Sequence, residues 1–339
     1  MRAAVYQGPR DVQIVELPEP EHGDKAVVRI KAAGICAADA GFYTGKFAYA
    51  NYPRIGGHEL VGVVEYAPQG AHIQAGERVV VNPLSACGKC YPCRHGKPNC
   101  CTSIAVLGVQ ADGGYAEKIA VPAEKLVSIG DLPFEQAVLI EPYTIGYHAV
   151  ERAGAVAGEN VLVMGAGAIG LAIVDQALRA GAAAVAAADM YPERLEAARA
   201  MGAEGVNVAE MDIRVFANAR TAGEGFGVVF DATGNSRATE SCFNIVAPGG
   251  TVVIIGLGKD KVSIDGVDFT RREMNILGSR NSVNAFEPVT AMMREGGLHP
   301  ELLLTHRFAF ENIADALERV TGDLRGVIKA ALFFTREGL

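Results

Sequence analysis

Four cysteines stand close together in one segment of the chain, with two residues between each of the first three and seven before the last. They are Cys87, Cys90, Cys93 and Cys101, and glycines and prolines punctuate the segment between them. Four thiolates complete the tetrahedral coordination of Zn²⁺ and leave no position for water or substrate. The spacing therefore predicts a structural zinc site that holds a loop in shape, so that a catalytic metal must be bound elsewhere.

A second set of possible metal ligands lies upstream, where Cys36, His58 and Glu59 offer a thiolate, an imidazole and a carboxylate. Three protein ligands with one position left open is the pattern of a catalytic zinc site. Cys36 follows the largely apolar run 26–33, and His58-Glu59 precedes the apolar run 60–64, so we expect both at strand ends or turns. Taken alone, Cys36 and His58 are equally compatible with a buried cysteine and a core histidine.

Composition limits the class of protein. With 339 residues, 50% hydrophobic residues and 40 glycines, the chain is long enough for two domains of α/β type. The net charge of −8 argues against nucleic acid as a partner. No apolar stretch of membrane-spanning length is free of glycine or charge, and the seven cysteines without a signal-like segment indicate a reducing compartment. The sequence thus predicts a cytoplasmic protein with no membrane partner.

The middle of the chain carries a dinucleotide-binding pattern. An apolar strand is predicted over 161–164, the segment 165–170 has the form G-x-G-x-x-G, and an apolar-periodic helix is predicted from 171 to about 180. A second strand over 184–188 leads to Asp189, nineteen residues after the last glycine of the motif. The motif is weak alone, but here it follows a strand and opens a helix, as a mononucleotide-binding unit requires.

Each glycine of this motif has a physical role. Gly165 permits the tight turn, Gly167 lets the backbone approach a pyrophosphate at the positive helix N-terminus, and Gly170 allows close packing of helix on strand. The cofactor-binding set predicted in this turn is Gly165, Gly167, Ala168, Ile169 and Gly170.

Asp189 is predicted to accept hydrogen bonds from both hydroxyls of the adenosine ribose. A carboxylate there repels the 2′-phosphate of NADP, and neither Met190 nor Tyr191 offers a compensating charge, so the sequence favours NAD. Arg194 is predicted either to contact the adenosine or to cap the following helix.

The alternation of strand and helix continues through strands predicted at 228–231, 251–255 and 275–277, with a helix over 238–246. This completes a doubly wound sheet. Ligands of such sheets bind at the carboxyl ends of the strands, although the glycine turns there are also compatible with ordinary connections. Further cofactor contacts are predicted at Thr233, Gly256, Leu257 and Ser279.

After residue 280 the pattern changes again. Amphipathic helices are predicted over 286–293 and 311–320, and a strand over 327–334. These residues either form a third small domain or pack back onto the first domain and complete it. We expect the return, because an unpartnered final strand would be an exposed edge, which pairing with the N-terminal sheet removes.

Together the motifs resemble the zinc-dependent medium-chain dehydrogenase/reductase family, which includes alcohol, sorbitol and threonine dehydrogenases. The resemblance covers the whole chain and is strongest at 57–64 and 86–101. It implies a Rossmann domain and a GroES-like β-barrel catalytic domain that the C-terminal segment completes. The implied boundaries are 1–145 with 282–339 for the catalytic domain and 146–281 for the Rossmann domain.

The resemblance also implies roles for individual residues. Cys36 and His58 would bind a catalytic zinc, Asp39 would accept a hydrogen bond from the other nitrogen of His58, and the four-cysteine loop would bind a second zinc. Glu59 and Glu141 compete for the remaining protein ligand, since Glu141-Pro142 is the polyol-dehydrogenase form of a site where ethanol-type enzymes carry cysteine.

One part of the family pattern is missing. Ala38 and Gly41 stand where the family usually has a serine or threonine and a histidine or other polar residue that pass the alcohol proton outward. The proton would then leave through water and a glutamate, or through Tyr43 or Thr44.

Short segments resemble one branch of the family, the bacterial sugar-acid dehydrogenases grouped with the starvation-sensing proteins, which include oxidoreductases for L-galactonate and L-gulonate. In sorbitol dehydrogenases an arginine that matches Arg280 lies by the catalytic glutamate and the substrate; an ion pair with Glu141 is the alternative role. The segments that carry this resemblance are 107–109, 112–114, 140–145 and 279–281.

The expected function is oxidation of a secondary hydroxyl of a sugar acid to a ketone, in which zinc lowers the pKa of the hydroxyl and NAD accepts a hydride. Sorbitol-type polyol and threonine dehydrogenases are the alternatives within the enzyme class. A regulatory protein that senses NAD without turnover is the alternative outside it, because the usual proton relay is missing. The resemblance further implies a homodimer or homotetramer.

Aromatic residues are dense before the His58 motif, in a chain with only 7% aromatics. They are expected either to line the substrate pocket or to pack an irregular loop. The residues are Phe42, Tyr43, Phe47, Tyr49 and Tyr52.

Overall fold

The computed structural model describes residues 1–47 and 50–334, and the predicted pocket residue Tyr49 lies outside the described residues. The chain divides into two compact units, each treated by itself below. The first contains Met1–Glu141, Phe286–Gly296 and Leu304–Leu339, and the second contains Pro142–Ala285 and Gly297–Leu303. No helix in the described part of the chain is long and apolar enough to cross a membrane.

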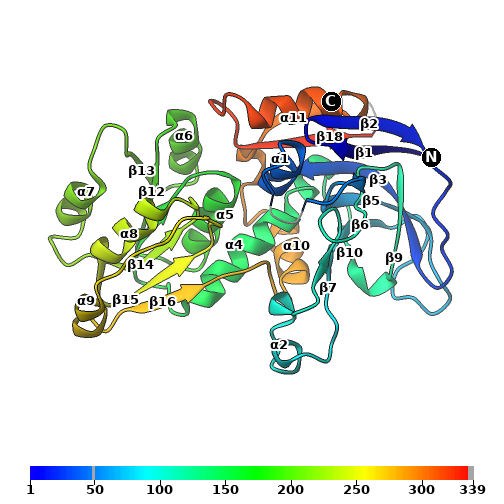
Figure 1. Ribbon diagram of the computed structural model, residues 1–339. Helices are drawn as coiled ribbons and strands as arrows, with labels where there is room; N and C mark the ends of the chain where they lie inside the picture. Colours follow the sequence, from blue (N-terminus) through cyan, green and yellow to red (C-terminus); the bar gives the residue numbers. More distant parts are fainter. Residues whose placement is uncertain (48–49, 335–339) are drawn as a thin grey trace. The chain divides into compact units, whose positions relative to one another are not determined.

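The first unit is built on a seven-stranded sheet with the order β10-β6-β5-β3-β18-β17, in which β9 also pairs with β3 (Figure 1). A three-stranded sheet has the order β2-β1-β4, and β7 pairs with β8. The strands are β1 (Arg2–Gly8), β2 (Asp11–Glu16), β3 (Ala26–Ile35), β4 (Arg54–Ile55), β5 (Glu59–Tyr66), β6 (Arg78–Val81), β7 (Leu84–Ser85), β8 (Ala105–Val106), β9 (Lys118–Val121), β10 (Leu126–Ser128), β17 (Leu304–Ala309) and β18 (Lys329–Phe333).

Short helices accompany these strands. They are α1 (Ala37–Tyr43), α2 (Tyr91–Arg94), α3 (Phe134–Ala137), α10 (Phe286–Arg294) and α11 (Ile313–Thr321), with 3₁₀ turns at Pro98–Cys100, Ala123–Lys125 and Phe310–Asn312. The core of this unit is formed by alternate residues of the strands, such as Val28, Ile30 and Leu60, all of which are fully buried.

The final strand returns to the N-terminal sheet, as predicted. β18 pairs antiparallel with β3, so that Ala330 lies opposite Ile35 and Ala331 opposite Gly34. The predicted strand over 327–334 is shorter in the structure, and the predicted helices over 286–293 and 311–320 correspond to α10 and α11. Pairing with β18 covers a stretch of β3 that would otherwise be an open edge.

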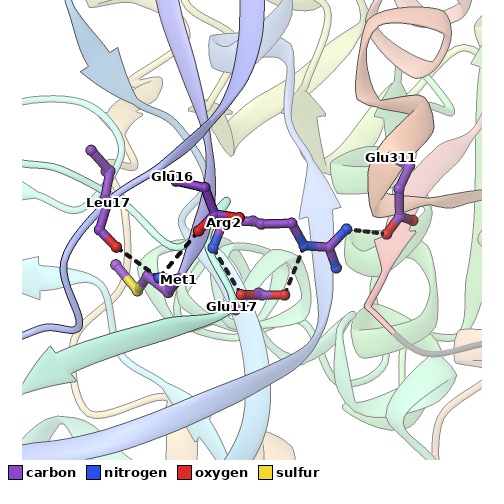
Figure 2. A network of polar contacts seen from close by, with 6 residues as sticks. All are labelled: Met1, Arg2, Glu16, Leu17, Glu117 and Glu311. Carbon is purple, nitrogen blue, oxygen red and sulfur yellow. Dashed lines mark hydrogen bonds and ion pairs between the residues drawn. The ribbon is translucent and has the colours of Figure 1, made fainter.

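A polar network also ties the C-terminal segment to the N-terminal strand (Figure 2). Arg2 on β1 donates to Glu117 through both its backbone nitrogen and Nε, and to Glu311 through its guanidinium, at 2.7–2.9 Å. In the same network the amino group of Met1 donates to the carbonyl of Leu17 at 2.7 Å. The Arg2 pairs are partly exposed, so their net contribution to stability is about 1 kcal/mol or less each.

The second unit is a parallel sheet of six strands with the order β13-β12-β11-β14-β15-β16. Its parallel pairings confirm the predicted doubly wound fold. The strands are β11 (Asn160–Met164), β12 (Ala184–Asp189), β13 (Glu204–Asn207), β14 (Phe226–Asp231), β15 (Val246–Ile254) and β16 (Asn275–Gly278).

Helices connect these strands (Figure 1). They are α5 (Ala168–Arg179), α6 (Pro192–Ala200), α7 (Ile213–Arg220), α8 (Ser236–Ile245) and α9 (Gly266–Arg271), with a 3₁₀ turn at Pro300–Leu302. Helix α4 (Ile140–Ala153) begins in the first unit with Ile140 and Glu141 and continues in the second. Phe226, Val229 and Val252 are among the buried residues of the core between the sheet and its helices.

Candidate metal centres and dinucleotide site

The antiparallel pairing of β3 with β5 brings the predicted catalytic ligands together. Glu59 is the first residue of β5 and lies opposite Gly34 near the end of β3, while Cys36 follows β3 directly and is the N-cap of α1. His58 precedes Glu59, so both segments end at the same edge of the sheet. One ligand atom from each of Cys36, His58 and Glu59 lies within 4.8 Å of the others.

The donor atoms of this cluster suit a metal ion. His58 and Glu59 are 7% and 1% exposed, and both His58 Nδ1 and Glu59 Oε2 are buried with no hydrogen-bond partner in the described structure. Buried polar atoms without partners are costly. A thiolate, an imidazole and a carboxylate are ligands that Zn²⁺ prefers, and a bound cation would satisfy the unpartnered carboxylate oxygen of Glu59. The cluster therefore fits the predicted catalytic zinc.

Negative charge is concentrated around the cluster. Burial by itself lowers the pKa of His58, but the charges of Cys36, Asp39 and Glu141 outweigh it and hold that pKa well above its usual value. Burial, reinforced by the charge of Glu59, raises the pKa of Glu141 to about 7. Both shifts report a negative potential that a divalent cation would relieve.

The two competing glutamates occupy different positions. Glu59 belongs to the group of atoms within 4.8 Å, whereas Glu141, in the first turn of α4, is not part of that group among the described residues. Glu141 still interacts electrostatically with His58 and Glu59. In this structure Glu59 is thus the carboxylate in ligand range, and Glu141 lies further from the other two ligands.

Asp39 does not make the predicted contact with His58. Its Oδ2 accepts from the backbone nitrogen of Cys36 at 2.9 Å and its Oδ1 from that of Gly57 at 3.3 Å, while His58 Nδ1 has no partner. The bond to Cys36 forms because Asp39 is the third residue of α1, where a carboxylate caps the free N–H groups of the helix start, and the second oxygen reaches the segment before His58. Asp39 therefore orients the segments that carry Cys36 and His58 through their backbones.

Lys329, which the sequence reasoning missed, forms a buried ion pair with Glu59. Its Nζ donates to Glu59 Oε1, and the two side chains are 5% and 1% exposed. Burial lowers the pKa of Lys329, but Glu59 and Cys36 outweigh it and raise that pKa above its usual value. The one available signal was a charged residue inside the apolar run 327–334.

The four-cysteine loop forms a second cluster, in which the sulfur atoms of Cys87, Cys90, Cys93 and Cys101 lie within 4.8 Å of one another. The backbone nitrogens of Cys87 and Ser103 donate to Cys101 Sγ at 3.3 Å.

Backbone donors favour a thiolate at Cys90, since N–H groups of Thr102 and Cys93 lower its pKa to about 5, whereas burial and the neighbouring thiols raise the pKa of Cys93 to about 12. The cysteines are free of disulfides. Four thiols at this spacing with thiolate-stabilising donors fit a closed zinc site.

The dinucleotide motif folds as its glycines require. Gly165 has φ +89°, and a Cβ on Gly170 would lie 1.7 Å from the carbonyl oxygen of Gly165. Gly167 is the N-cap of α5, whose first turn contains Ala168 and Ile169. Backbone N–H groups at such a helix start bind anions, so the turn can hold a pyrophosphate.

Asp189 ends β12 and is 7% exposed. It accepts from the backbone nitrogens of Ala166 at 2.8 Å and Tyr191 at 3.0 Å. Arg194 Nη1 lies 3.4 Å from Asp189 Oδ2, and its guanidinium stacks 4.8 Å from the centre of the Tyr191 ring. Arg194 is therefore placed beside the predicted ribose-binding carboxylate.

The other predicted cofactor contacts lie at carboxyl ends of strands. Thr233 follows β14 and donates through its backbone and hydroxyl to Asp231, at 2.9 and 2.6 Å. Leu257 is 92% exposed, and Ser279 is buried with its Oγ unpartnered in the described structure.

Gly256 also belongs to this edge, close to the backbone of Gly234, where a Cβ would lie 2.1 Å from the nitrogen. Arg280 is exposed and follows β16 by two residues in the second unit, whereas Glu141 belongs to the first. The predicted relation between Arg280 and Glu141 thus stays a prediction.

The hydroxyls considered for proton relay have other partners. Tyr43 Oη donates to Glu318 at 2.7 Å, and burial together with this bond raises the pKa of Tyr43 to about 12. Thr44 Oγ1 donates to the carbonyl of Ala40 at 2.8 Å.

The described aromatic residues before His58 pack together. Phe42 is fully buried, and its ring lies 5.1 Å from that of Phe47, 6.1 Å from Tyr6 and 6.3 Å from Tyr52. Packing of the segment, the alternative to a pocket wall, accounts for these residues.

Comparison with known proteins matches both halves of the chain to dehydrogenase families. Residues 22–131 match the alcohol dehydrogenase GroES-like domain, and residues 168–295 match the zinc-binding dehydrogenases. The chain is 35% identical to L-galactonate-5-dehydrogenase of Escherichia coli (strain K12), with 98% of this chain and 99% of that protein covered. It is 32% identical to sorbitol dehydrogenase of Bacillus subtilis (strain 168), with 94% and 93% covered.

A solved structure has the same fold over nearly its whole length. The alcohol dehydrogenase RspB from E. coli CFT073, in complex with NADH, is 34% identical, with 98% of this chain and 99% of that one covered and a TM-score of 0.92. The predicted fold class, enzyme class and cofactors, zinc and NAD, agree with these matches. The chain therefore belongs to the zinc-dependent medium-chain dehydrogenases, oxidoreductases that act on CH–OH groups and join a GroES-like domain to a Rossmann domain.

Proposed function

We propose that this enzyme oxidises a secondary hydroxyl of a sugar acid of the L-galactonate or L-gulonate kind to a ketone, with NAD as hydride acceptor. The observation that carries the reaction type is the buried cluster of Cys36, His58 and Glu59, whose three different donors and unpartnered carboxylate oxygen suit a zinc with an open position. The sugar-acid substrate is supported by the nearly full-length similarity to L-galactonate-5-dehydrogenase. The coarser assignment, a zinc-type dehydrogenase of polyols or sugar acids, holds for either substrate class.

Different residues of this chain have different proposed roles in the reaction. Cys36 and His58 would hold the zinc, with Glu59 or Glu141 as the third protein ligand. Bound zinc supplies a Lewis acid that lowers the pKa of the substrate hydroxyl. The burial of His58 and Glu59 excludes water from this side of the reaction.

The cofactor would be bound through the second unit. The first turn of α5 would bind the pyrophosphate and Asp189 the adenosine ribose, which favours NAD over NADP. Arg280 would pair with the carboxylate of the sugar acid. We further propose the domain boundaries 1–145 with 282–339 and 146–281, a cytoplasmic location, a homodimer or homotetramer, and neither nucleic acid nor membrane as partner.

The test is NADH formation by the zinc-loaded enzyme with a panel of hexonates beside neutral polyols, each repeated with NADP and with a chelator. Chelator-sensitive turnover of hexonates with NAD is the expected result. Arg280→Ala should then raise the KM for a hexonate while it leaves the KM for NAD within about twofold. Turnover of polyols alone would overturn the sugar-acid assignment.

A sorbitol-type polyol dehydrogenase is the second candidate. Two observations favour it: the 32% identity to sorbitol dehydrogenase and the Glu141-Pro142 pair. The regulatory alternative predicts that the protein binds NAD and fails to reduce it with every member of the panel. Threonine in the same panel tests the remaining alternative.

A further inference from the structure

We propose that Lys329 is a positioning residue of the catalytic metal site, which holds one carboxylate oxygen of Glu59 and leaves the other oxygen to the metal. The inference rests on the proposed function insofar as it takes Cys36, His58 and Glu59 to surround the catalytic zinc. It concerns a residue that neither touches the substrate nor ligates the metal, and it explains how the site remains open.

Strand register places Lys329 on the same face of the sheet as Glu59. Glu59 on β5 lies opposite Gly34 on β3, and Gly34 lies opposite Ala331 on β18. Lys329 precedes Ala331 by two positions, and residues two apart in a strand point to the same face. The Glu59 side chain therefore has to pass over β3 to reach Lys329.

Gly34 lacks a side chain and so leaves space for the Glu59 side chain to cross β3. A Cβ at position 34 would lie 1.8 Å from Glu59 Oε2 and 3.0 Å from the carboxyl carbon. The space above this glycine is thus occupied by the carboxylate of Glu59. The glycine two residues before Cys36 has a spatial role here, since it lets a carboxylate from one neighbouring strand reach an ammonium from the other.

The two oxygens of Glu59 have different surroundings. Oε1 accepts from Lys329 Nζ, whereas Oε2 is buried without a partner and belongs to the side chain grouped with Cys36 and His58. With one oxygen held by the lysine, Glu59 can offer a metal a single oxygen. A carboxylate that bound through both oxygens would fill the position that a substrate hydroxyl needs.

Lys329 also compensates negative charge at the metal site. With Cys36 as thiolate and Asp39, Glu59 and Glu141 as carboxylates, the negative charges of the site outnumber the two positive charges that Zn²⁺ supplies. The ammonium of Lys329, 4% exposed, adds a further positive charge. Uncompensated charge is costly in such a buried environment, so the lysine allows two carboxylates to coexist beside one divalent ion.

The test replaces Lys329 by methionine in the full-length enzyme and measures metal binding without substrate. Co²⁺ is exchanged into the catalytic site, its visible absorption is recorded, and zinc retention is measured by competition with a chelator. In Lys329→Met both oxygens of Glu59 are free and the repulsion between ammonium and metal is gone. We expect weaker Co²⁺ absorption, typical of a higher coordination number, and about tenfold or more tighter zinc binding.

Lys125→Met is the matched control, because Lys125 is a half-buried lysine of the same unit whose Nζ donates to the carbonyl of Leu84 at 2.6 Å. It should leave the Co²⁺ spectrum and zinc retention as in the wild type. An unchanged spectrum and affinity in Lys329→Met, with only lower thermal stability, would overturn the proposal in favour of a plain structural ion pair. Loss of the catalytic metal in Lys329→Met would overturn it as well.

A double variant covers the case in which Lys329→Met does not fold. Glu59→Gln with Lys329→Met replaces both buried charges by uncharged groups of similar size, a change that buried pairs commonly tolerate. We expect this protein to bind the catalytic zinc at least about tenfold more weakly than the wild type, because the anionic oxygen is missing. Unchanged zinc affinity would mean that the free oxygen of Glu59 does not contact the metal. These readouts need no substrate, so failure of the hexonate assay leaves them intact.

Discussion

The two metal clusters of this protein are assembled in opposite ways. The four cysteines between Cys87 and Cys101 come from one loop, offer four identical donors and are supported by local backbone N–H groups. The cluster of Cys36, His58 and Glu59 comes from two strand ends, has three different donors, and depends on Lys329, 270 positions after Glu59. A site made within one loop can be read from spacing, whereas a site made by a sheet depends on register and on residues that the spacing does not show.

The largest effect is expected from breaking the sheet-built cluster alone. Cys36→Ser should lower turnover by about a thousandfold or more, since the loss of a Lewis acid removes several kcal/mol of transition-state stabilisation. Metal analysis should then find one zinc per chain where the wild type has two. Cys100→Ser, at an exposed cysteine beside the loop cluster, is the control and should keep both zinc ions. A fully active Cys36→Ser protein would show that this cluster is not the catalytic site.

Gly34→Ala tests whether the space above residue 34 is needed for the Glu59 carboxylate. The added methyl group meets the carboxylate of Glu59 at 1.8 Å, so that side chain must move. We expect zinc affinity at the catalytic site to fall by about tenfold and unfolding free energy by about 1–3 kcal/mol, the usual cost of overpacking. Equilibrium dialysis and urea unfolding measure the two effects.

Gly8→Ala is the matched control, because a Cβ there meets nothing within 4 Å. It lies in β1 of the same unit and should change zinc affinity less than about twofold. Equal losses in the two variants would point to a general effect of glycine replacement in strands.

A smaller effect on turnover is expected from the loop-built cluster. Cys90→Ser should release the structural zinc, lower unfolding free energy by about 3 kcal/mol and make the loop sensitive to proteases, because the metal no longer holds its shape. Turnover per folded molecule at low temperature should fall much less than in Cys36→Ser. If the catalytic zinc is lost together with the structural one, the two clusters are not independent.

The smallest effect is expected from Tyr43→Phe. The variant removes the partly buried hydrogen bond to Glu318 and should cost about 1 kcal/mol of stability or less. Because the pKa of Tyr43 is raised to about 12, the contribution of its neutral hydroxyl is fully present below pH 10 and is lost as pH rises through about 12. Thermal unfolding at several pH values measures this. Turnover should stay within about twofold of the wild type. A large fall in turnover would instead support the hypothesis that Tyr43 relays the alcohol proton.

The sequence was informative where short-range pattern decides the structure. The dinucleotide turn could be predicted because a strand, spaced glycines and a helix follow one another directly, and β18 could be assigned to the first sheet because an unpaired strand is unfavourable. The contact between Asp39 and His58 was predicted wrongly, since one oxygen of Asp39 is engaged by the start of α1 and the other by the backbone of Gly57. That competition depends on side-chain geometry, which spacing does not contain.

Lys329 could not be predicted for a different reason. Its role arises from three strands in register, with Gly34 between Glu59 and the lysine. No local pattern links residues so far apart in the chain. The glycine before Cys36 was visible in the sequence, but only the carboxylate in the space above it reveals its purpose.

The late position of β18 in the chain sets an order of events during synthesis. A ribosome delivers β3, β5 and the four-cysteine loop early, and the strand that carries Lys329 emerges only after the whole parallel sheet of the second unit has been made. Until then residues 32–35 of β3 lack β18 as a neighbour on one side, and Glu59 lacks its counter-charge. Nascent chains can thus bind zinc at the four-cysteine loop before β18 is made. The pair of Lys329 with Glu59 at the catalytic centre forms only after β18 has been synthesised.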